Sequence, residues 1–391
     1  MRENINQENE RGVLEQGRPL YLLELQNFRN ISSCQWFPHP RFNFFFGQNA
    51  QGKTSFLEAI YFLSELKSFR TQENASLIQH GQENSLLRAE LKLHSITQDL
   101  AVMILAATKN VHLNGKKPRP YSKLRQILPI VLFTPDSTRL FRTSPGERRA
   151  YFDRILSLLS EDYTLGLEDY HKVLKQKQEL LDQAEERLCI SPQLEVWNEK
   201  MAILGSKLIF LRFRFTEKIA QKFGFYFPSL SGALWKSLFY YEPYLASIRQ
   251  DMNSAEIEKL LLEEIKKRNN EERERKQVLV GPHRDDWGIL LEGQKLKEEA
   301  SQGQHRLSMA ALKLSEVALI REMGKTPLAL FDDLLSELDA FRCRLILQVL
   351  SECACQVFLT SVTPLGVPLE GLDGLSYEVK KGELLTPSPI N

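Results

Sequence analysis

The chain of 391 residues has few cysteines and lacks a long apolar run. Its cysteines are odd in number, scattered and without a C-x-x-C pair, which argues against a disulfide framework and a zinc site. No apolar stretch approaches about 18 residues, so we expect no membrane-spanning helix and no membrane partner. The polar start lacks the apolar core of a secretory signal, and we therefore expect a cytoplasmic protein. The cysteines are Cys34, Cys189, Cys343, Cys353 and Cys355.

The chain also lacks an excess of either charge. Its 51 basic and 50 acidic side chains give a net charge of +1. Overall charge therefore points to no partner, and a nucleic-acid surface has to come from local clustering. The length suits two or three domains, each with a substantial core.

The first half of the chain contains a strand, a glycine-rich loop and a helix in that order. Residues 20–28 and 41–46 are rich in aromatic and branched side chains, which predicts strands. Gly47 breaks the second strand, and residues 55–66 have apolar side chains at helical spacing. Alternating apolar residues over 91–105 predict further strands.

The middle of the chain has a different pattern. Residues 163–188 and 194–223 have helical spacing, and the short connection between them predicts an antiparallel helical hairpin. A third helix is expected over 255–276, which ends in a charged run at 271–276. We interpret that run as a solvated helix face.

Strands and helices then alternate toward the end of the chain. We expect strands at residues 278–280, 288–291, 327–331 and 356–359, and a helix at 306–321. Such alternation predicts an α/β core with a mainly parallel sheet. The helical middle is then an insertion between two halves of one domain.

The glycine loop matches the P-loop pattern G-x-x-x-x-G-K-[ST] in its required context. Its glycines let backbone N–H groups face phosphates, and the following helix adds its N-terminal dipole. Lys53 is expected on the β- and γ-phosphates of ATP, and the Thr54 hydroxyl on Mg²⁺. The nucleotide-binding residues are Gly47, Gln48, Asn49, Ala50, Gln51, Gly52, Lys53 and Thr54.

A P-loop needs a second acidic group for the metal, held rigidly at the end of a buried strand. Four apolar residues followed by Asp332 and Asp333 supply it. We expect Asp332 to hold Mg²⁺ with Thr54, and Asp333 to polarise the attacking water as a general base. Lys53, Asp332 and Asp333 are thus the predicted catalytic residues. The alternative is a strand followed by an acidic helix cap.

Residues 301–306 place a serine and a glycine before a helix, where N–H groups can meet a phosphate. The segment resembles the signature of ATP-binding-cassette enzymes, which faces the P-loop of a second subunit. That resemblance adds Ser301, Gly303 and Gln304 to the nucleotide-binding residues. Residues 336–339 resemble the dimer-contact loop of the same class. A plain helix cap is the alternative for the signature.

Taken together, these motifs resemble the bacterial RecF family of DNA repair proteins, relatives of the SMC and cassette ATPases. The likeness runs from residue 20 to about 381, and residues 68–81, 132–153 and 281–293 resemble further family blocks. It implies an α/β, ABC/SMC-like P-loop ATPase head, split in sequence, with an inserted helical lobe. The expected parts are a disordered extension at 1–19, half-heads at 20–135 and 277–391, and the lobe at 136–276.

The resemblance also implies an ATP-gated, dimeric clamp on single-stranded, gapped or duplex DNA. Its roles would be recombinational repair, replication restart, recombinase loading with RecO- and RecR-type mediators, and SOS induction. Two departures from cassette enzymes point to slow, DNA-stimulated hydrolysis. Asp333 replaces the usual glutamate, and residues 360–363 stand where many cassette enzymes carry a phosphate-sensing histidine. Gln72 and Gln79 are candidates for the Q-loop glutamine.

Residues 100–135 contain no Asp or Glu, so a basic hairpin there is a candidate DNA surface. The alternative is an edge hairpin whose lysines prevent strand pairing. The candidate DNA-binding residues are Lys109, Lys116, Lys117, Arg119, Lys123 and Arg125. A second arginine cluster at 139–154 is expected to touch nucleotide or DNA, or to pair with the acids of segment 281–286.

Two other functions compete with the slow ATPase. One is a transporter ATPase subunit, against which the long helical insertion argues. The other is an interaction protein in which ATP gates dimerisation without significant hydrolysis. Measurement of DNA-stimulated phosphate release distinguishes this non-hydrolysing interaction protein from the slow ATPase.

Overall fold

The computed structural model describes residues 19–93, 96–183, 191–334, 338–353, 355–362 and 371–390. The chain forms two compact units, Met1–Ser137 with Lys313–Asn391 and Thr138–Leu312. It passes between them within the 3-10 helix η2 (Pro135–Arg142) and helix α10 (Gln302–Glu322). The second unit extends past residue 276, where the sequence suggested its end. The reason is that β9 (Asp286–Leu291) pairs with β8 (Ser237–Glu242).

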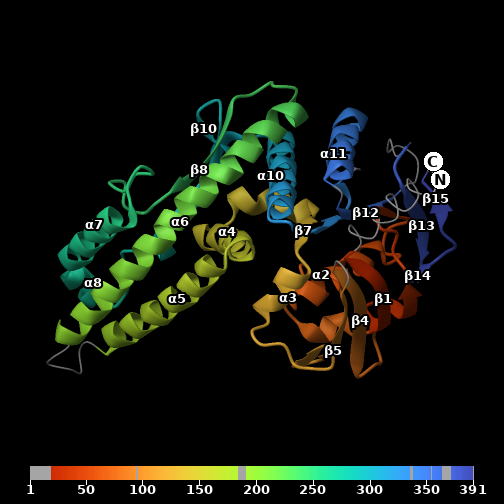
Figure 1. Cartoon of the computed structure of the whole chain (residues 1–391), viewed down its shortest axis with the longest axis horizontal. Coiled ribbons are helices and arrows are strands. Elements are labelled where there is room, and N and C mark those ends of the chain that lie inside the picture. Colours follow the sequence, from red (N-terminus) through yellow and green to blue (C-terminus); the bar gives the residue numbers. More distant parts are fainter. Residues whose placement is uncertain are drawn as a thin grey trace, which may run out of the picture. The chain divides into compact units, whose positions relative to one another are not determined.

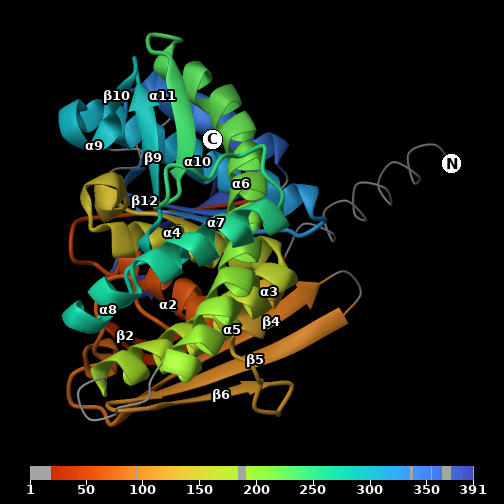
Figure 2. The same cartoon turned by 90° about the vertical axis from the view of Figure 1, so that its left-hand side faces the viewer.

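An antiparallel sheet forms one layer of the first unit (Figure 2). Its central strands alternate buried and half-buried side chains, as in a sheet with one face on a core. The strands predicted at 20–28 and within 91–105 are therefore confirmed. In order across the sheet they are β2 (Ile31–Trp36), β1 (Leu20–Phe28), β4 (Asn84–Leu93), β5 (Ile96–Leu105) and β6 (Lys109–Leu113).

The other sheet of this unit is mainly parallel, as predicted. The three strands on one side of the P-loop strand are buried throughout, which is typical of strands covered on both faces. The order is β13 (Gly374–Lys380), β3 (Phe42–Phe46), β12 (Gln356–Ser361), β11 (Leu328–Phe331) and β7 (Ile130–Phe133). Short strands β14 (Glu383–Leu384) and β15 (Ser388–Pro389) pair antiparallel with β13. Because β12 lies between β3 and β11 and is parallel to both, the carboxyl ends of all three lie at one edge.

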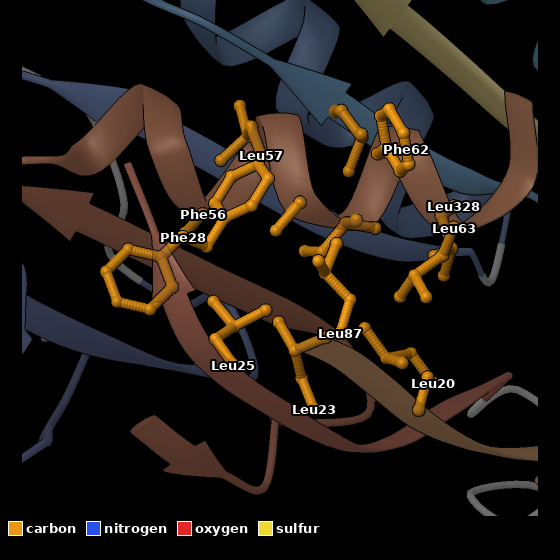
Figure 3. Packing of buried hydrophobic residues seen from close by; sticks show 14 of the residues in the cluster. Leu20, Leu23, Leu25, Phe28, Phe56, Leu57, Phe62, Leu63, Leu87 and Leu328 are labelled. Carbon is orange, nitrogen blue, oxygen red and sulfur yellow. The ribbon is translucent and has the colours of Figure 1, made fainter. Parts of the chain in front are cut away.

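Helix α2 (Lys53–Glu65) lies in the core of this unit (Figure 3). Phe56, Leu57 and Leu63 pack in one cluster with residues of both sheets, including Leu20, Leu87 and Leu328. Nearly the whole circumference of α2 is buried, as expected of a helix enclosed on several sides. The core therefore fixes the helix that begins at the P-loop lysine. The remaining helices of the unit are α3 (Ser122–Ile127), η1 (Asn74–Leu77) and α11 (Ala340–Glu352).

The second unit is mostly helical. Helices α5 (Glu161–Asp182) and α6 (Ser191–Ser231) form the predicted antiparallel hairpin (Figure 1). Helix α6 runs beyond the predicted end at residue 223, because Phe223 stacks on Phe227 and packs against β8. Of the described helices, none is long and apolar enough to span a membrane. The unit also holds α4 (Pro145–Leu159), β10 (Gln294–Lys295) and α9 (Leu296–Glu299).

Two predictions about residues 255–276 are wrong. The helix expected over 255–276 is two helices, α7 (Ser254–Lys267) and α8 (Asn269–Arg275), which meet at Arg268. The charged run is not wholly solvated, because Glu272 is fully buried against Lys177, with 2.6 Å between Nζ and Oε2.

Residues 278–280 form no strand. These residues are buried. Side-chain oxygens, and not the backbone of a neighbouring strand, accept the hydrogen bonds of two of their N–H groups. The N–H of Val278 donates to Gln178 Oε1 at 3.2 Å, and that of Leu279 donates to Glu272 Oε1 at 2.8 Å. The apolar pattern of residues 278–280 therefore reflects their burial and not their pairing in a sheet.

Candidate nucleotide site

The loop after β3 has the backbone of an anion-binding loop. Gly47, Ala50 and Gly52 have positive φ angles of 143°, 63° and 112°. A Cβ at Gly47 would lie 2.6 Å from the carbonyl oxygen of Val379, and one at Gly52 would lie 2.7 Å from Asn30 Nδ2. Glycine is therefore required at both positions, for conformation and for space.

Lys53 is 5% exposed and folds back over this loop. Its Nζ donates to the carbonyl oxygens of Gly47 at 2.6 Å and Gln48 at 2.9 Å. Burial lowers the pKa of Lys53, whereas Asp333 and Asp332 act to raise it. The ammonium group thus lies where a P-loop holds phosphate oxygens.

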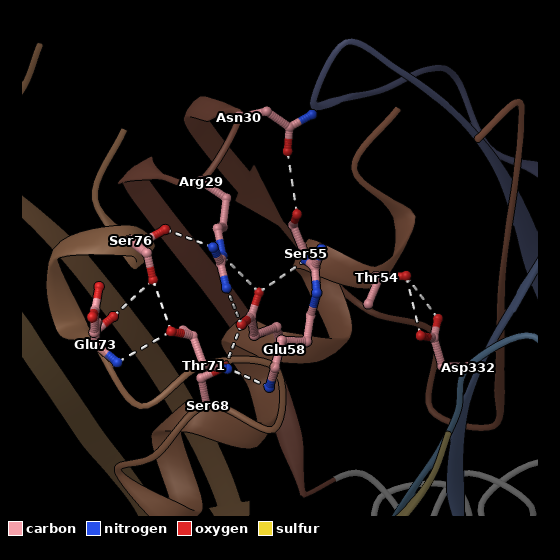
Figure 4. Close-up of polar contacts among 11 residues, drawn as sticks. Arg29, Asn30, Thr54, Ser55, Glu58, Ser68, Thr71, Glu73, Ser76 and Asp332 are labelled. Atoms are coloured by element: carbon pink, nitrogen blue, oxygen red, sulfur yellow. Dashed lines mark hydrogen bonds and ion pairs between the residues drawn. The ribbon is translucent and has the colours of Figure 1, made fainter. Parts of the chain in front are cut away.

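Thr54 and Asp332 meet although 278 positions separate them. The Thr54 hydroxyl donates to Asp332 Oδ1 at 2.9 Å and lies 3.2 Å from Oδ2 (Figure 4). Asp332 is 7% exposed and follows the buried strand β11. A hydroxyl and a carboxylate are oxygen ligands of the kind that Mg²⁺ prefers.

Asp333 and Thr360 lie beside this pair. Asp333 has a left-handed backbone, with φ of 50°, which is uncommon for a residue other than glycine. Its N–H donates to the Thr360 hydroxyl at 2.9 Å, and that hydroxyl donates to Asp332 Oδ1 at 2.7 Å. Thr360 was predicted only to stand in the segment where many cassette enzymes carry a histidine, and these contacts were not predicted. Thr363 lies outside the described residues.

A buried carboxylate on α2 organises the other side of the loop. Glu58 is fully buried and accepts from Arg29 at 2.6 and 2.9 Å, from Ser68, and from Arg70 at 3.4 Å (Figure 4). This cluster was not predicted. The available signal was Glu58 among the apolar residues of the helix, because a buried carboxylate needs partners.

Part of this set lines a cavity of about 440 Å³, whereas Asp332, Thr360 and Glu58 are not among its lining residues. Arginine, lysine and loop N–H groups on one side and a carboxylate on the other suit a polyphosphate with a divalent cation. The cavity lining includes neither Gln72 nor Gln79, and Gln79 instead donates to Ser32. The lining residues are Arg29, Asn30, Asn49, Ala50, Gly52, Lys53, Thr54, Ser55, Arg70, Ser76, Ile78 and Asp333.

Gly47, Gln48 and Gln51 of the predicted loop residues are not part of this lining, and Gln51 has a structural contact instead. Its side-chain oxygen accepts from the N–H of Lys381 at 2.8 Å. Its carbonyl oxygen accepts from Asn30 Nδ2 at 2.9 Å and from the N–H of Gly382 at 2.8 Å. Gln51 therefore anchors the loop to its neighbours.

The described residues contain no group of three or more His, Cys, Asp or Glu side chains that would hold a metal. Cys343 and Cys355 are buried, and burial raises the pKa of Cys355 to about 12. Cys353 is only partly buried. Cys189 lies outside the described residues.

Ser301, Gly303 and Gln304 lie at the start of α10, in the second unit. The N–H of Gln304 donates to Ser301 Oγ at 3.2 Å, and Gln304 Oε1 accepts from the N–H of Ser301 at 2.8 Å. The serine thus caps its helix, and both Ser301 and Gly303 are exposed. In the segment that resembles the dimer-contact loop of cassette enzymes, Asp339 caps helix α11. Its side chain accepts a hydrogen bond from the N–H of Arg342. Residues 335–337 lie outside the described residues.

The candidate DNA-binding residues divide into two groups. Lys109 donates to the carbonyl oxygen of Leu66 at 2.6 Å, and Arg125 pairs with Glu65 at 2.8 Å, so both side chains pack against α2. Burial lowers the pKa of Lys109. The remaining candidates are exposed, namely Lys116, Lys117, Arg119 and Lys123.

In the second arginine cluster, two members contact segment 281–286, one through a carboxylate and one through a backbone carbonyl oxygen. Arg148 pairs with Asp286, with 2.5 Å between Nη2 and Oδ2. Arg149 donates to the carbonyl oxygen of Asp285 at 2.8 Å. The fully buried Asp285 also pairs with Arg212 at 2.9 Å.

Comparison with known proteins gives a consistent result. Residues 19–367 match the family model described as the RecF/RecN/SMC N terminal domain. The chain is 34% identical to the DNA replication and repair protein RecF of Geotalea uraniireducens (strain Rf4), over 94% of this chain and 98% of that protein. It is also 34% identical to RecF of Desulforamulus reducens, over 93% of this chain and 97% of that protein.

Solved structures agree. The recombination mediator protein RecF with ATP in the RecFOR pathway matches with a TM-score of 0.84 and 27% identity. That match covers 95% of this chain and 99% of the other. An SMC head bound to the C-terminal winged-helix domain of ScpA matches with a TM-score of 0.57 and 15% identity, which shows a shared fold alone.

Proposed function

This chain belongs to the RecF/RecN/SMC N-terminal domain family, and on that premise we propose that it is an ATP-dependent DNA replication and repair protein of the RecF type. The contact between Thr54 and Asp332 carries the nucleotide part of this proposal. It unites a P-loop with an acidic strand end from the far half of the sequence, beside a cavity of about 440 Å³. The relatives are called RecF, and one solved relative is a complex with ATP.

In the proposed reaction, ATP binds with its phosphates against the loop N–H groups. Lys53 exchanges its contacts with the carbonyl oxygens of Gly47 and Gln48 for phosphate oxygens. Thr54 and Asp332 hold Mg²⁺, which when bound supplies a Lewis acid that neutralises phosphate charge. Asp333 orients the attacking water and accepts its proton at a carboxylate oxygen. Its side chain is one methylene shorter than glutamate, which favours slow turnover.

We propose that the site is completed by a second copy of the chain. Ser301 and Gly303 are exposed at the N-terminus of α10, where N–H groups and the helix dipole attract an anion. In the proposed dimer they face the nucleotide of the partner, so that ATP promotes dimerisation and hydrolysis reverses it. Such a protein is a slow clamp on DNA, and by family resemblance it acts with RecR- and RecO-type mediators to load the recombinase and support SOS induction.

The DNA contacts proposed here are the exposed cations of the 100–135 window. Lys116 and Lys117 lie in the turn after β6, where Asn114 and Gly115 have the positive φ angles of a tight turn. Exposed lysines with no acid in the surrounding window meet phosphates without reading bases. We therefore expect binding that depends on salt and little on sequence.

A salt series tests the DNA proposal. Fluorescence anisotropy with labelled gapped duplex and Mg²⁺-ATP should show affinity that falls steeply with salt. The double substitution Lys116→Gln with Lys117→Gln should reduce the slope of log affinity against log salt by about 2, since each lost phosphate contact lowers it by about 1.

The matched control replaces Lys172 and Lys175, two exposed lysines of α5, with glutamine. It removes the same charge and should leave the slope unchanged. If the two double substitutions reduced the slope equally, the net charge of the protein, and not contacts of Lys116 and Lys117 with DNA, would explain the salt dependence. DNA affinity independent of nucleotide would overturn the clamp.

A further inference from the structure

The register of the parallel sheet places one hydroxyl between the two nucleotide-binding strands. Phe331 of β11 lies opposite Leu359 of β12, so the next residues, Asp332 and Thr360, meet at the carboxyl edge. On its other side Thr360 pairs with Phe45 of β3, the strand that leads into the P-loop. Thr360 is 1% exposed. The strand that carries it therefore joins the phosphate loop to the acidic strand end.

The Thr360 hydroxyl makes two hydrogen bonds with opposite roles. It donates to Asp332 Oδ1 at 2.7 Å and accepts from the N–H of Asp333 at 2.9 Å. A hydroxyl has one hydrogen, so the acceptor role fixes where that hydrogen points. Both consecutive carboxylate residues thus depend on a single oxygen atom.

These two bonds act on different features of the site. Asp332 Oδ1 accepts from both Thr360 and Thr54 at 2.9 Å or less, whereas Oδ2 has the longer contact, 3.2 Å from Thr54. Oδ2 therefore retains more capacity for a cation. The bond to the Asp333 N–H stabilises a left-handed backbone that an aspartate adopts at a cost. That backbone sets the direction in which the Asp333 side chain leaves the strand.

We propose that Thr360 is a positioning residue for the metal ligand and the general base. Its hydroxyl fixes the rotation of the Asp332 carboxylate so that one oxygen remains for Mg²⁺, and it holds Asp333 in its left-handed conformation. Thr360 does not touch the nucleotide itself. The proposal rests on the proposed nucleotide site and adds the group that orients its acidic half.

The substitution Thr360→Val tests this, because it removes the hydroxyl and keeps the branched shape. Affinity for a fluorescent ATP analogue should be measured with Mg²⁺ and with EDTA, together with a Mg²⁺ titration at fixed nucleotide. We expect the half-saturating Mg²⁺ concentration to rise roughly tenfold or more, as when a partner of a metal ligand is removed. Affinity in EDTA should change less than about twofold, since the phosphate loop is untouched. Thr360→Ser should restore the wild-type Mg²⁺ dependence.

The matched control is Ser85→Ala. Ser85 is a fully buried serine in the same unit, and its hydroxyl donates to the carbonyl oxygen of Gln26 at 3.0 Å. Its loss should lower thermal stability in the way that Thr360→Val does, without changing the Mg²⁺ titration.

Wild-type Mg²⁺ dependence in Thr360→Val would overturn the proposal. So would an equal loss of nucleotide affinity with Mg²⁺ and with EDTA, since Thr360 would then support the pocket as a whole. Failure of the wild-type protein to bind the analogue under either condition would instead refute the nucleotide site itself.

Discussion

Two lysines of this chain are buried in different electrostatic settings. Lys177 is fully buried against Glu272, so its charge is neutralised within the protein. Lys53 instead donates to two backbone carbonyl oxygens. Burial lowers the pKa of Lys53, and the nearby carboxylates of Asp333 and Asp332 offset part of that effect. Carbonyl dipoles are weaker partners than a carboxylate or a phosphate. Lys53 can therefore be transferred to a phosphate, whereas Lys177 cannot leave its partner without stranding a buried charge.

The substitution Lys53→Arg should separate binding from turnover. Arginine keeps the charge, but its planar fork cannot occupy the space of a compact ammonium between Gly47 and Gln48. We expect nucleotide affinity to change only a few-fold and ATP turnover to fall roughly a hundredfold, the scale of losing one group that stabilises the transition state. Nucleotide anisotropy and phosphate release measure the two effects.

Lys325→Arg is the matched control. Lys325 is another partly buried lysine of the first unit, and its Nζ contacts Gln126 Oε1. Turnover should be unaffected. If Lys53→Arg abolished nucleotide binding, the lysine would act in ground-state binding and not chiefly in the reaction.

At the scale of elements, segment 278–284 is held by side chains. His283 accepts from or donates to Tyr170 at 2.8 Å and lies 3.2 Å from the carbonyl oxygen of Val278. Gly281 has φ of 136°, and a Cβ there would lie 2.4 Å from the Tyr170 hydroxyl. Burial lowers the pKa of His283 to about 4. The residues that resemble a family block thus serve the packing of the second unit.

This gives a pH dependence of stability. Because the folded pKa of His283, about 4, lies below its ordinary value of about 6.5, the unfolded chain takes up the proton first as the pH falls. This contribution to the free energy of unfolding is complete above pH 6.5 and is lost toward pH 4, by roughly 3 kcal/mol. We expect His283→Gln to flatten this fall in urea unfolding followed by tryptophan fluorescence.

The control is His80→Gln, which replaces an exposed histidine of the first unit and should leave in place the loss of stability attributed to His283. His305 will keep part of the profile in the His283 variant, because burial and the charge of Arg142 lower its pKa to about 4. Identical profiles for wild type and His283→Gln would show that His283 does not titrate in this way.

The elements that the sequence predicted correctly have local causes. The P-loop helix and strands β3 and β11 follow from apolar runs bounded by glycine or aspartate. The errors lie where distant residues decide. Residues 278–280 are apolar because they are buried, but Gln178 and Glu272 replace the sheet partners. Thr360 gave no local signal at all, since its role depends on strand order in the sheet.

At the scale of the whole molecule, the candidate site combines distant parts of the sequence within one unit, while the signature residues belong to the other unit. Residues 47–54 and Asp332 lie in the first unit, and Ser301 and Gly303 in the second. If a nucleotide contacts the P-loop of one copy and the signature residues of another, its binding has to change the solvent protection of both units. This consequence distinguishes the proposed composite site from a site formed by the P-loop alone.

Hydrogen exchange on the two units provides the test. With saturating Mg²⁺-ATP, backbone amides of residues 47–54 should become protected, and those of residues 301–304 should do so only at protein concentrations where light scattering shows a dimer. Ser301→Arg places a large cation at the exposed start of α10 and should abolish the second protection while keeping the first. Ser160→Ala, which removes the cap of α5, controls for loss of a helix cap and should preserve both. Protection of 301–304 in a monomer, or a monomer at saturating ATP, would contradict completion of the site by a second copy.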